Sequence, residues 1–159
     1  MADIKIFTDG AAKGNPGNGG YGIVMLSGPH RKELSQGYRH TTNNRMELLS
    51  VIIALETIKN NDNNVTVYSD FKYVVDAVEK GWVFNWAKKG FKGKKNADLW
   101  QRFLKIYPKN KVRFVWVKGH AHHLENNRCD QLAVAAAGSG GLLIDEGYES
   151  NKEGNGDLF

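Results

Sequence analysis

The sequence predicts an α/β fold built on a five-stranded mixed sheet with helices on both faces. Two observations lead to it. Three strand-like segments come first, joined by short connections, so they form an antiparallel meander. Helices and two further strands then alternate, and helical crossovers allow those strands to run parallel to the first one.

The three early strands are read from alternation and turn residues. Residues 3–9 alternate apolar and polar side chains, and residues 20–28 and 31–41 have strand character. Gly28-Pro29 supplies turn chemistry between the second and third segments. The glycine-rich stretch "FTDGAAKGNPGNGGYG", residues 7–22, joins the first two segments. It carries neither a Walker motif nor a dinucleotide fingerprint. We therefore interpret Gly14-Asn15-Pro16-Gly17 as a turn between strands rather than as a phosphate loop.

The later elements follow from periodicity and capping residues. We expect a helix over 41–61, capped by Thr42, Asn43 or Asn44 and ended by Asn60-Asn61. A strand over 64–70 and helices over 71–82 and 97–107 come next, then a strand over 111–119 and a helix over 125–138. These elements form one domain over 1–138, and we expect the Gly-rich residues 139–159 to be a flexible tail.

Composition limits the class of protein. The chain has 159 residues and ordinary apolar and charged fractions, without an apolar run long enough for a membrane span or a secretory signal. We expect no membrane partner. Cys129 is the single cysteine, which excludes an internal disulfide and is typical of the cytoplasm.

The positive charge is local. The formal net charge is +5, yet residues 80–97 alone contain six lysines and no acid. A run of this kind is either a solvated loop or a surface for a polyanion. We call residues 80–97 the basic protrusion.

Four acids lie at strand ends or on partly apolar helix faces, where a charged side chain needs a partner. Asp9 and Asp70 each end a predicted strand, and in open α/β sheets ligands bind beyond the carboxyl ends of strands. Glu47 lies on a helical stripe with Val51, Ala54, Leu55 and Ile58, where an unpaired carboxylate is costly. Asp130 shares a predicted helix face with Asn126, Ala133, Val134 and Ala137.

Each acid alone has an ordinary explanation as a helix cap, a helix-dipole partner or a surface charge. Together they indicate a carboxylate cluster neutralised by a cation. Oxygen-only ligands favour Mg²⁺ or Mn²⁺, and two such ions are the usual device for phosphodiester hydrolysis. An acidic metal site beside a basic surface predicts a metal-dependent nuclease.

The chain resembles bacterial ribonuclease H of type I. The resemblance lies in "FTDGAAKGNPGNGGYG", "TTNNRMELL", "SDFKYV", "GWVFNWAKKGFK", "DLWQR" and "WVKGHAHHLENNRCDQLA", in family order over roughly residues 3–137. It implies a ribonuclease H-like fold and an endonuclease that cleaves the RNA strand of RNA–DNA hybrids without base specificity. The products implied are 3′-hydroxyl and 5′-phosphate ends, and the cofactor implied is two Mg²⁺ ions, which Mn²⁺ can replace.

The resemblance also implies roles for individual residues. Asp9, Glu47, Asp70 and Asp130 match the metal-binding acids, and His120 matches a loop histidine that assists proton transfer or product departure. A zinc site of His122 and His123 with Cys129 lacks the usual ligand spacing. The implied substrate contacts are Asn15, Thr42, Asn43, Asn44, Lys72, Trp82, Trp86, Lys88, Lys89, Lys92, Lys94, Lys95, Trp100 and Asn126. For Trp82 and Trp86, core packing is the competing explanation.

Departures from the family pattern concern three positions. Lys72 stands where the family commonly has glutamine, and His122 and Leu124 replace the usual Gly and Pro beside His120. The effects of these departures on metal preference and rate stay open, as does the role of the tail.

The expected assembly is simple. We expect a cytoplasmic monomer whose partner is the RNA–DNA hybrid. The terminal "GNGDLF" resembles peptides that dock on bacterial replication clamps, with an inert end as the alternative. Two rival functions remain, a DNA nuclease of the same superfold and a hybrid-binding module without activity; cleavage assays on different duplexes separate them.

Overall fold

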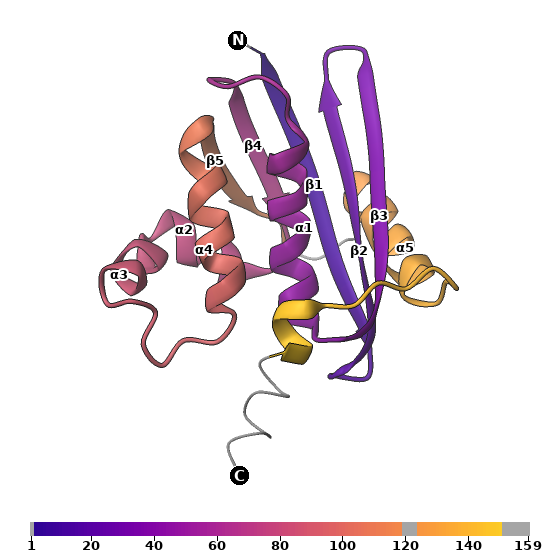
Figure 1. The fold of residues 1–159 in the computed structure, drawn as a ribbon. Helices are drawn as coiled ribbons and strands as arrows, with labels where there is room; N and C mark the ends of the chain where they lie inside the picture. Colours follow the sequence, from indigo (N-terminus) through magenta and orange to yellow (C-terminus); the bar gives the residue numbers. More distant parts are fainter. Residues whose placement is uncertain (1, 119–123, 151–159) are drawn as a thin grey trace.

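The fold is that of a computed structural model, which describes residues 2–118 and 124–150 (Figure 1). Strands and helices follow the predicted order, with boundaries shifted by a few residues. In chain order they are β1 (Asp3–Lys13), β2 (Gly17–Ser27), β3 (His30–Thr41), α1 (Asn43–Thr57), β4 (Asn64–Ser69), α2 (Lys72–Glu79), α3 (Trp82–Lys88), α4 (Ala97–Ile106), a short 3₁₀ turn (Tyr107–Lys109), β5 (Lys111–Trp116) and α5 (Leu124–Ala137).

The five strands form one mixed sheet in the order β3-β2-β1-β4-β5. β1, β2 and β3 pair antiparallel, whereas β4 pairs parallel with both β1 and β5. The predicted meander and the two parallel strands are confirmed. The strand order reverses between β1 and β4, and in open α/β sheets such a switch point is where ligands bind.

Helices cover both faces of the sheet, as predicted. α1 packs on β1 and β2 with α4 beside it, and α5 packs on β1, β2 and β3 from the other side (Figure 1). The predicted apolar stripe of α1 is too narrow. Because α1 lies between the sheet and α4, it is buried on nearly every side from Arg45 to Leu55.

Two glycines of the sheet allow α5 to approach it closely. A Cβ atom at Gly22 would lie 2.2 Å from the carbonyl oxygen of Cys129, and one at Gly37 would lie 2.1 Å from that of Ala136. Both positions therefore need glycine for lack of space. The turn over residues 14–16 is confirmed, but the glycines that follow it have this packing role, which turn chemistry does not explain.

Residues 139–150 do not form the flexible segment expected from their composition. Leu143 makes a parallel bridge to Tyr38, with backbone hydrogen bonds of 2.9 Å from Leu143 N to Gly37 O and from Arg39 N to Leu143 O. Asp145 is 6% exposed, and residues 146–150 are helical. The segment is held by long-range contacts, which local glycine content does not reveal. The "GNGDLF" peptide lies outside the described residues.

Among the helices of residues 2–118 and 124–150, none has the length and apolar character needed to cross a bilayer.

Candidate active site

The parallel register of β1 and β4 brings two acids to the same position. Phe7 is the last β1 residue paired with β4, opposite Tyr68. Asp9 and Asp70 each follow two residues later, so they lie side by side just beyond the parallel ladder. The Asp9 side chain leaves the sheet toward the face that α5 covers, because its cross-strand partner Gly22 faces Cys129 of α5.

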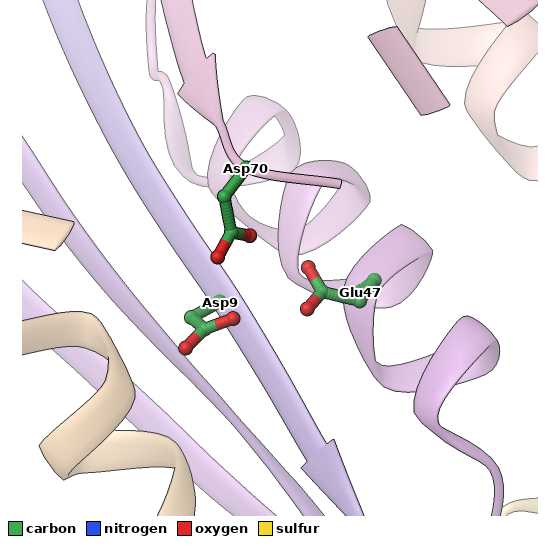
Figure 2. Close-up of side chains that lie close together, drawn as sticks. All are labelled: Asp9, Glu47 and Asp70. Atoms are coloured by element: carbon green, nitrogen blue, oxygen red, sulfur yellow. The ribbon is translucent and has the colours of Figure 1, made fainter. Parts of the chain in front are cut away.

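Glu47 reaches the same place from α1. The helix runs so close to β1 that a Cβ atom at Gly10 would lie 2.4 Å from the backbone nitrogen of Glu47. Figure 2 shows the Glu47 carboxylate directed at those of Asp9 and Asp70. One carboxylate oxygen from each of the three residues lies within 4.8 Å of the others. We call Asp9, Glu47 and Asp70 the acidic cluster.

Burial and mutual repulsion make the acidic cluster hold its protons tightly. Burial raises the pKa of Asp9 to about 7, and the charges of Asp70 and Asp130 add to this, although a hydrogen bond with Glu47 acts in the opposite direction. Burial, and then the charge of Asp9, raise the pKa of Glu47 well above its usual range. Glu47 Oε2 is buried without a hydrogen-bond partner among the described residues. A cation bound here would relieve both the repulsion and the unpartnered oxygen.

Asp130, the fourth predicted acid, lies next to this cluster without being part of it. It is exposed on α5, yet its hydrogen bond and charge both raise the pKa of Asp9. Its position beside Asp9 agrees with the predicted cluster, and three residues of the helix face predicted for it, Asn126, Ala133 and Ala137, are buried. His120 lies outside the described residues.

The chain matches a known family over most of its length. The RNase H family model covers residues 1–138. The chain belongs to the ribonuclease H family. A ribonuclease H of Desulforamulus reducens is 55% identical over 150 residues, covering 91% of this chain and 94% of that protein. Ribonuclease HI of Synechocystis is 46% identical over 151 residues, covering 91% and 94%.

Solved ribonuclease H structures show the same fold. LC9-RNase H1, described as a type 1 RNase H with the type 2 active-site motif, has a TM-score of 0.79 and 33% identity, covering 94% of this chain and 80% of its own. LC11-RNase H1, solved in complex with RNA/DNA hybrid, has a TM-score of 0.60 and 28% identity, covering 84% and 96%. The predicted family, fold and ribonuclease H activity are thereby confirmed.

In this ribonuclease H, polar residues gather at the start of α1, near the acidic cluster. Thr42 is the N-cap, and its hydroxyl accepts a hydrogen bond of 3.2 Å from Arg45 N. Asn15, from the β1–β2 turn, accepts one of 3.2 Å from Asn43 N. Asn15, Asn43 and Asn44 are exposed. The predicted substrate contacts at this end of the helix are accessible, and a helix N-terminus favours anions.

The basic protrusion combines exposed lysines with supported tryptophans. Lys88, Lys89, Lys92, Lys94 and Lys95 are all exposed. Trp82 is 38% exposed, with Lys80 Nζ 5.7 Å from its ring centroid. Trp86 stacks on Tyr73 and contacts Trp100 edge-on. Lys94 Nζ lies 4.8 Å from the centroid of the Trp86 ring. Trp86 therefore has both a core role and an accessible surface, and its predicted substrate contact stays a prediction.

Two predicted substrate contacts are placed wrongly. Trp100 is 1% exposed and packs on Phe103 in the core, so its role is to support Trp86. Asn126 is 0% exposed, so it cannot touch a strand bound at the surface. A family motif marks residues that hold the site together as well as residues that contact the substrate, and the sequence does not separate the two.

Sequence reasoning missed two features beside the site. The Trp116 indole N–H donates to the carbonyl of Asp70 at 3.3 Å, and Lys72 Nζ lies 4.8 Å from the centroid of the same ring. Arg45 is 2% exposed and hydrogen-bonds Asp98 and Asp145. We call Arg45, Asp98 and Asp145 the Arg45 network. The sequence places Arg45 among the apolar residues of α1, two residues before Glu47. A charged side chain in such a position indicates that the arginine has an acidic partner.

Proposed function

We propose that this ribonuclease H cleaves the RNA strand of RNA–DNA hybrids endonucleolytically, using two Mg²⁺ ions that Asp9, Glu47, Asp70 and Asp130 hold. The observation that carries the proposal is the convergence of three carboxylates from β1, α1 and β4 within 4.8 Å. Mn²⁺ has the same ligand preference and can substitute.

The residues fit a pair of hard cations. The donors are carboxylate oxygens, and among residues 2–118 and 124–150 no His or Cys joins the acidic cluster. The raised pKa values of Asp9 and Glu47 come from burial and from repulsion between the carboxylates, which a positive charge would relieve. Bound divalent ions would supply that charge, polarise the scissile phosphate and lower the pKa of a water molecule.

The protein's own groups have three tasks in the reaction. The carboxylates would hold the ions that position the phosphate, and the Gly10 N–H donates to Asp9 Oδ1 at 3.0 Å, which orients that carboxylate. We assign proton transfer to His120, because an imidazole can both accept and donate a proton in general acid–base catalysis. Attack of a water oxygen on phosphorus, with departure of the 3′ oxygen, leaves a 3′-hydroxyl and a 5′-phosphate.

The substrate is held on two sides of this centre. We assign the backbone near the cut to Asn15, Thr42, Asn43 and Asn44, and the DNA strand to the lysines and tryptophans of the basic protrusion. Phosphate contacts carry no sequence information, and 2′-hydroxyl contacts distinguish RNA from DNA, so no base specificity is expected. The relative solved with an RNA/DNA hybrid supports this substrate. We place the protein in the cytoplasm as a monomer.

The test is a cleavage assay on three matched duplexes, RNA–DNA hybrid, duplex DNA and duplex RNA, with and without Mg²⁺. Cleavage of the hybrid's RNA strand alone, dependent on Mg²⁺, is the expected result. Cleavage of duplex DNA would identify a DNA nuclease of the same superfold. Hybrid binding without cleavage in Mg²⁺ or Mn²⁺ would identify a binding module.

Asp9→Asn separates the metal site from substrate binding. The variant should lose cleavage by a factor of about 10³ or more while binding the hybrid as before, since it removes one ligand and keeps the shape. Asp62→Asn, an exposed acid away from the cluster, is the matched control. Persistent cleavage by Asp9→Asn would refute the metal assignment.

A further inference from the structure

The face of the sheet that carries Asp9 is only partly covered. α5 packs on β1, β2 and β3. Every side chain that β4 and β5 direct to this face is exposed or half-buried, whereas Val65, Val67 and Phe114 on the opposite face are buried. The residues of β4 and β5 on the uncovered side are Asn64, Thr66, Tyr68, Lys111, Arg113 and Val115.

The register arranges these residues in layers that begin at the acidic cluster. Two residues back from Asp9 and Asp70 lie Phe7 and Tyr68, whose rings stack with centroids 4.8 Å apart and planes at 11°. Another two residues back lie Lys5 and Thr66, with Arg113 opposite Thr66 on β5. Two residues of strand span about 6.5 Å, so each layer lies about that far from the last. We call Lys5, Phe7, Thr66, Tyr68, Lys111 and Arg113 the open sheet face.

Charge and shape of the open sheet face suit a polyanion. Lys5, Lys111 and Arg113 are exposed. Arg113 Nε donates to Thr66 Oγ1 at 3.3 Å, which holds the side chain along the sheet. Asp3, at the start of β1, opposes this charge, and its carboxylate accepts a hydrogen bond of 3.1 Å from Asn64. A hollow of about 960 Å³ includes Lys5, Thr66, Tyr68 and Arg113 in its lining and continues past the strand ends to Tyr107 and Asn110.

We propose that the open sheet face binds single-stranded RNA that continues from the hybrid beyond the cleavage site. This inference rests on the proposed function, because the strand that passes the acidic cluster is then the RNA. A strand that follows β1 and β4 would pass from the acidic cluster over the Phe7–Tyr68 pair to the side chains of Lys5 and Arg113. Aromatic side chains beside a basic groove are the usual means of holding a single strand without reading its sequence.

The experiment compares two ligands in buffer with EDTA, so that binding is measured without cleavage. One is a short blunt RNA–DNA hybrid; the other carries a single-stranded RNA extension of a few nucleotides at one end. Both polarities are made, because the open sheet face lies on one side of the site. We expect one polarity to lower the Kd about fivefold relative to the blunt hybrid and to steepen the salt dependence, by a slope of about 1.4 for two neutralised phosphates.

The double variant Lys5→Gln/Arg113→Gln should lose this gain and bind the blunt hybrid with unchanged affinity. The matched control is Lys32→Gln/Lys105→Gln, which removes the same charge from exposed positions on β3 and α4 and should keep the gain. An extension that adds no affinity for the wild type, or an equal loss in both double variants, would overturn the inference.

A photo-crosslink locates the extension independently of affinity. A 4-thiouridine in the extension should crosslink to the peptide that contains Tyr68 or Arg113, and a crosslink only within the basic protrusion would contradict the placement. An acidic peptide that binds the wild type but not Lys5→Gln/Arg113→Gln, with no gain from RNA, would assign the face to a protein partner instead. Failure of the blunt hybrid to bind or be cleaved would refute the proposed function, an outcome distinct from all of these.

Discussion

Arg45 and Glu47 lie two residues apart in α1, and both are buried, but the charge around them differs. Arg45 has a side chain 3% exposed and hydrogen-bonds the carboxylates of Asp98 and Asp145. Glu47 faces Asp9 and Asp70, which are acids like itself. The Arg45 network contains its own cation, whereas the acidic cluster needs one from solution. One helix thus carries a cluster that stabilises the fold and a cluster that costs stability until a ligand binds.

The pKa values report the same contrast. Burial lowers the pKa of Arg45, but hydrogen bonds with Asp98 and Asp145 raise it above its usual value. Burial likewise raises the pKa of Asp98, and hydrogen bonds from Arg45 lower it below the usual value. In the acidic cluster, burial and neighbouring charges leave the pKa values of Asp9 and Glu47 raised. Paired buried charges stay ionised, and unpaired ones take up protons.

The largest effect on stability is expected from Arg45→Met. It leaves Asp145 buried without its cation, so the free energy of unfolding should fall by about 3–5 kcal/mol in urea titrations. In the double variant Arg45→Met/Asp145→Leu most of this loss should be absent, because apolar residues replace the whole pair. A single-variant loss below about 1 kcal/mol would mean that the network does not hold α1 to residues 139–150.

Asp9→Asn should change stability in the opposite direction. Without metal at pH 8, replacing a carboxylate whose pKa is raised from 3.8 to about 7 removes an unfavourable buried charge. The expected gain in the free energy of unfolding is about 2–4 kcal/mol, measured in urea with EDTA. Asp62→Asn should change it by less than about 0.5 kcal/mol, as is usual for surface substitutions. A loss of stability in Asp9→Asn would contradict the repulsion described for the cluster.

The stability of the metal-free protein should depend on pH through both the acidic cluster and the Arg45 network, with opposite signs. Asp9 binds its proton more tightly when folded, so stability rises as the pH falls from about 8 toward 5. Asp98 binds its proton less tightly when folded, so stability is lost as the pH falls below about 4. Urea midpoints across this range test the signs, and Asp9→Asn should reduce the upper limb, to which Glu47 also contributes, while leaving the lower limb unchanged. A monotonic profile for the wild type would contradict the comparison.

The smallest effect is expected from Asp98→Asn. The Asp98 side chain is 36% exposed, so water screens its ion pair with Arg45 and the loss should be under about 1 kcal/mol. Asp145 remains to pair with the guanidinium. Urea unfolding beside Arg45→Met measures it; an equal loss in both would place the energy of the network in Asp98 rather than Asp145.

Local patterns predicted the strands and most of the helices, because alternation, caps and strand ends are properties of neighbouring residues. Asp9 and Asp70 could be placed together from the expectation of parallel strands alone. Glu47 was recognised as an acid on an apolar face, although the extent of burial around α1 was underestimated. That burial comes from α4, whose packing no pattern within α1 reveals.

What the sequence did not predict depends on contacts between distant residues. The order of residues 139–150 rests on Asp145 meeting Arg45 and on Leu143 joining Tyr38. Glycine content indicates a loose segment and carries no information about such partners. Likewise, Trp100 and Trp86 lie in matching motifs, but only the packing distinguishes the buried ring from the half-buried one.

Gly22 has a consequence for the chemistry of the site. It pairs with Asp9 in the sheet, and Cys129, whose carbonyl rests above it, directly precedes Asp130. The distance between the Asp9 and Asp130 carboxylates therefore depends on Gly22 having no side chain. Any other amino acid would place a Cβ atom against the Cys129 carbonyl. A larger residue at position 22 should move Asp130 away from Asp9, and so widen the proposed metal site without changing any of its acids.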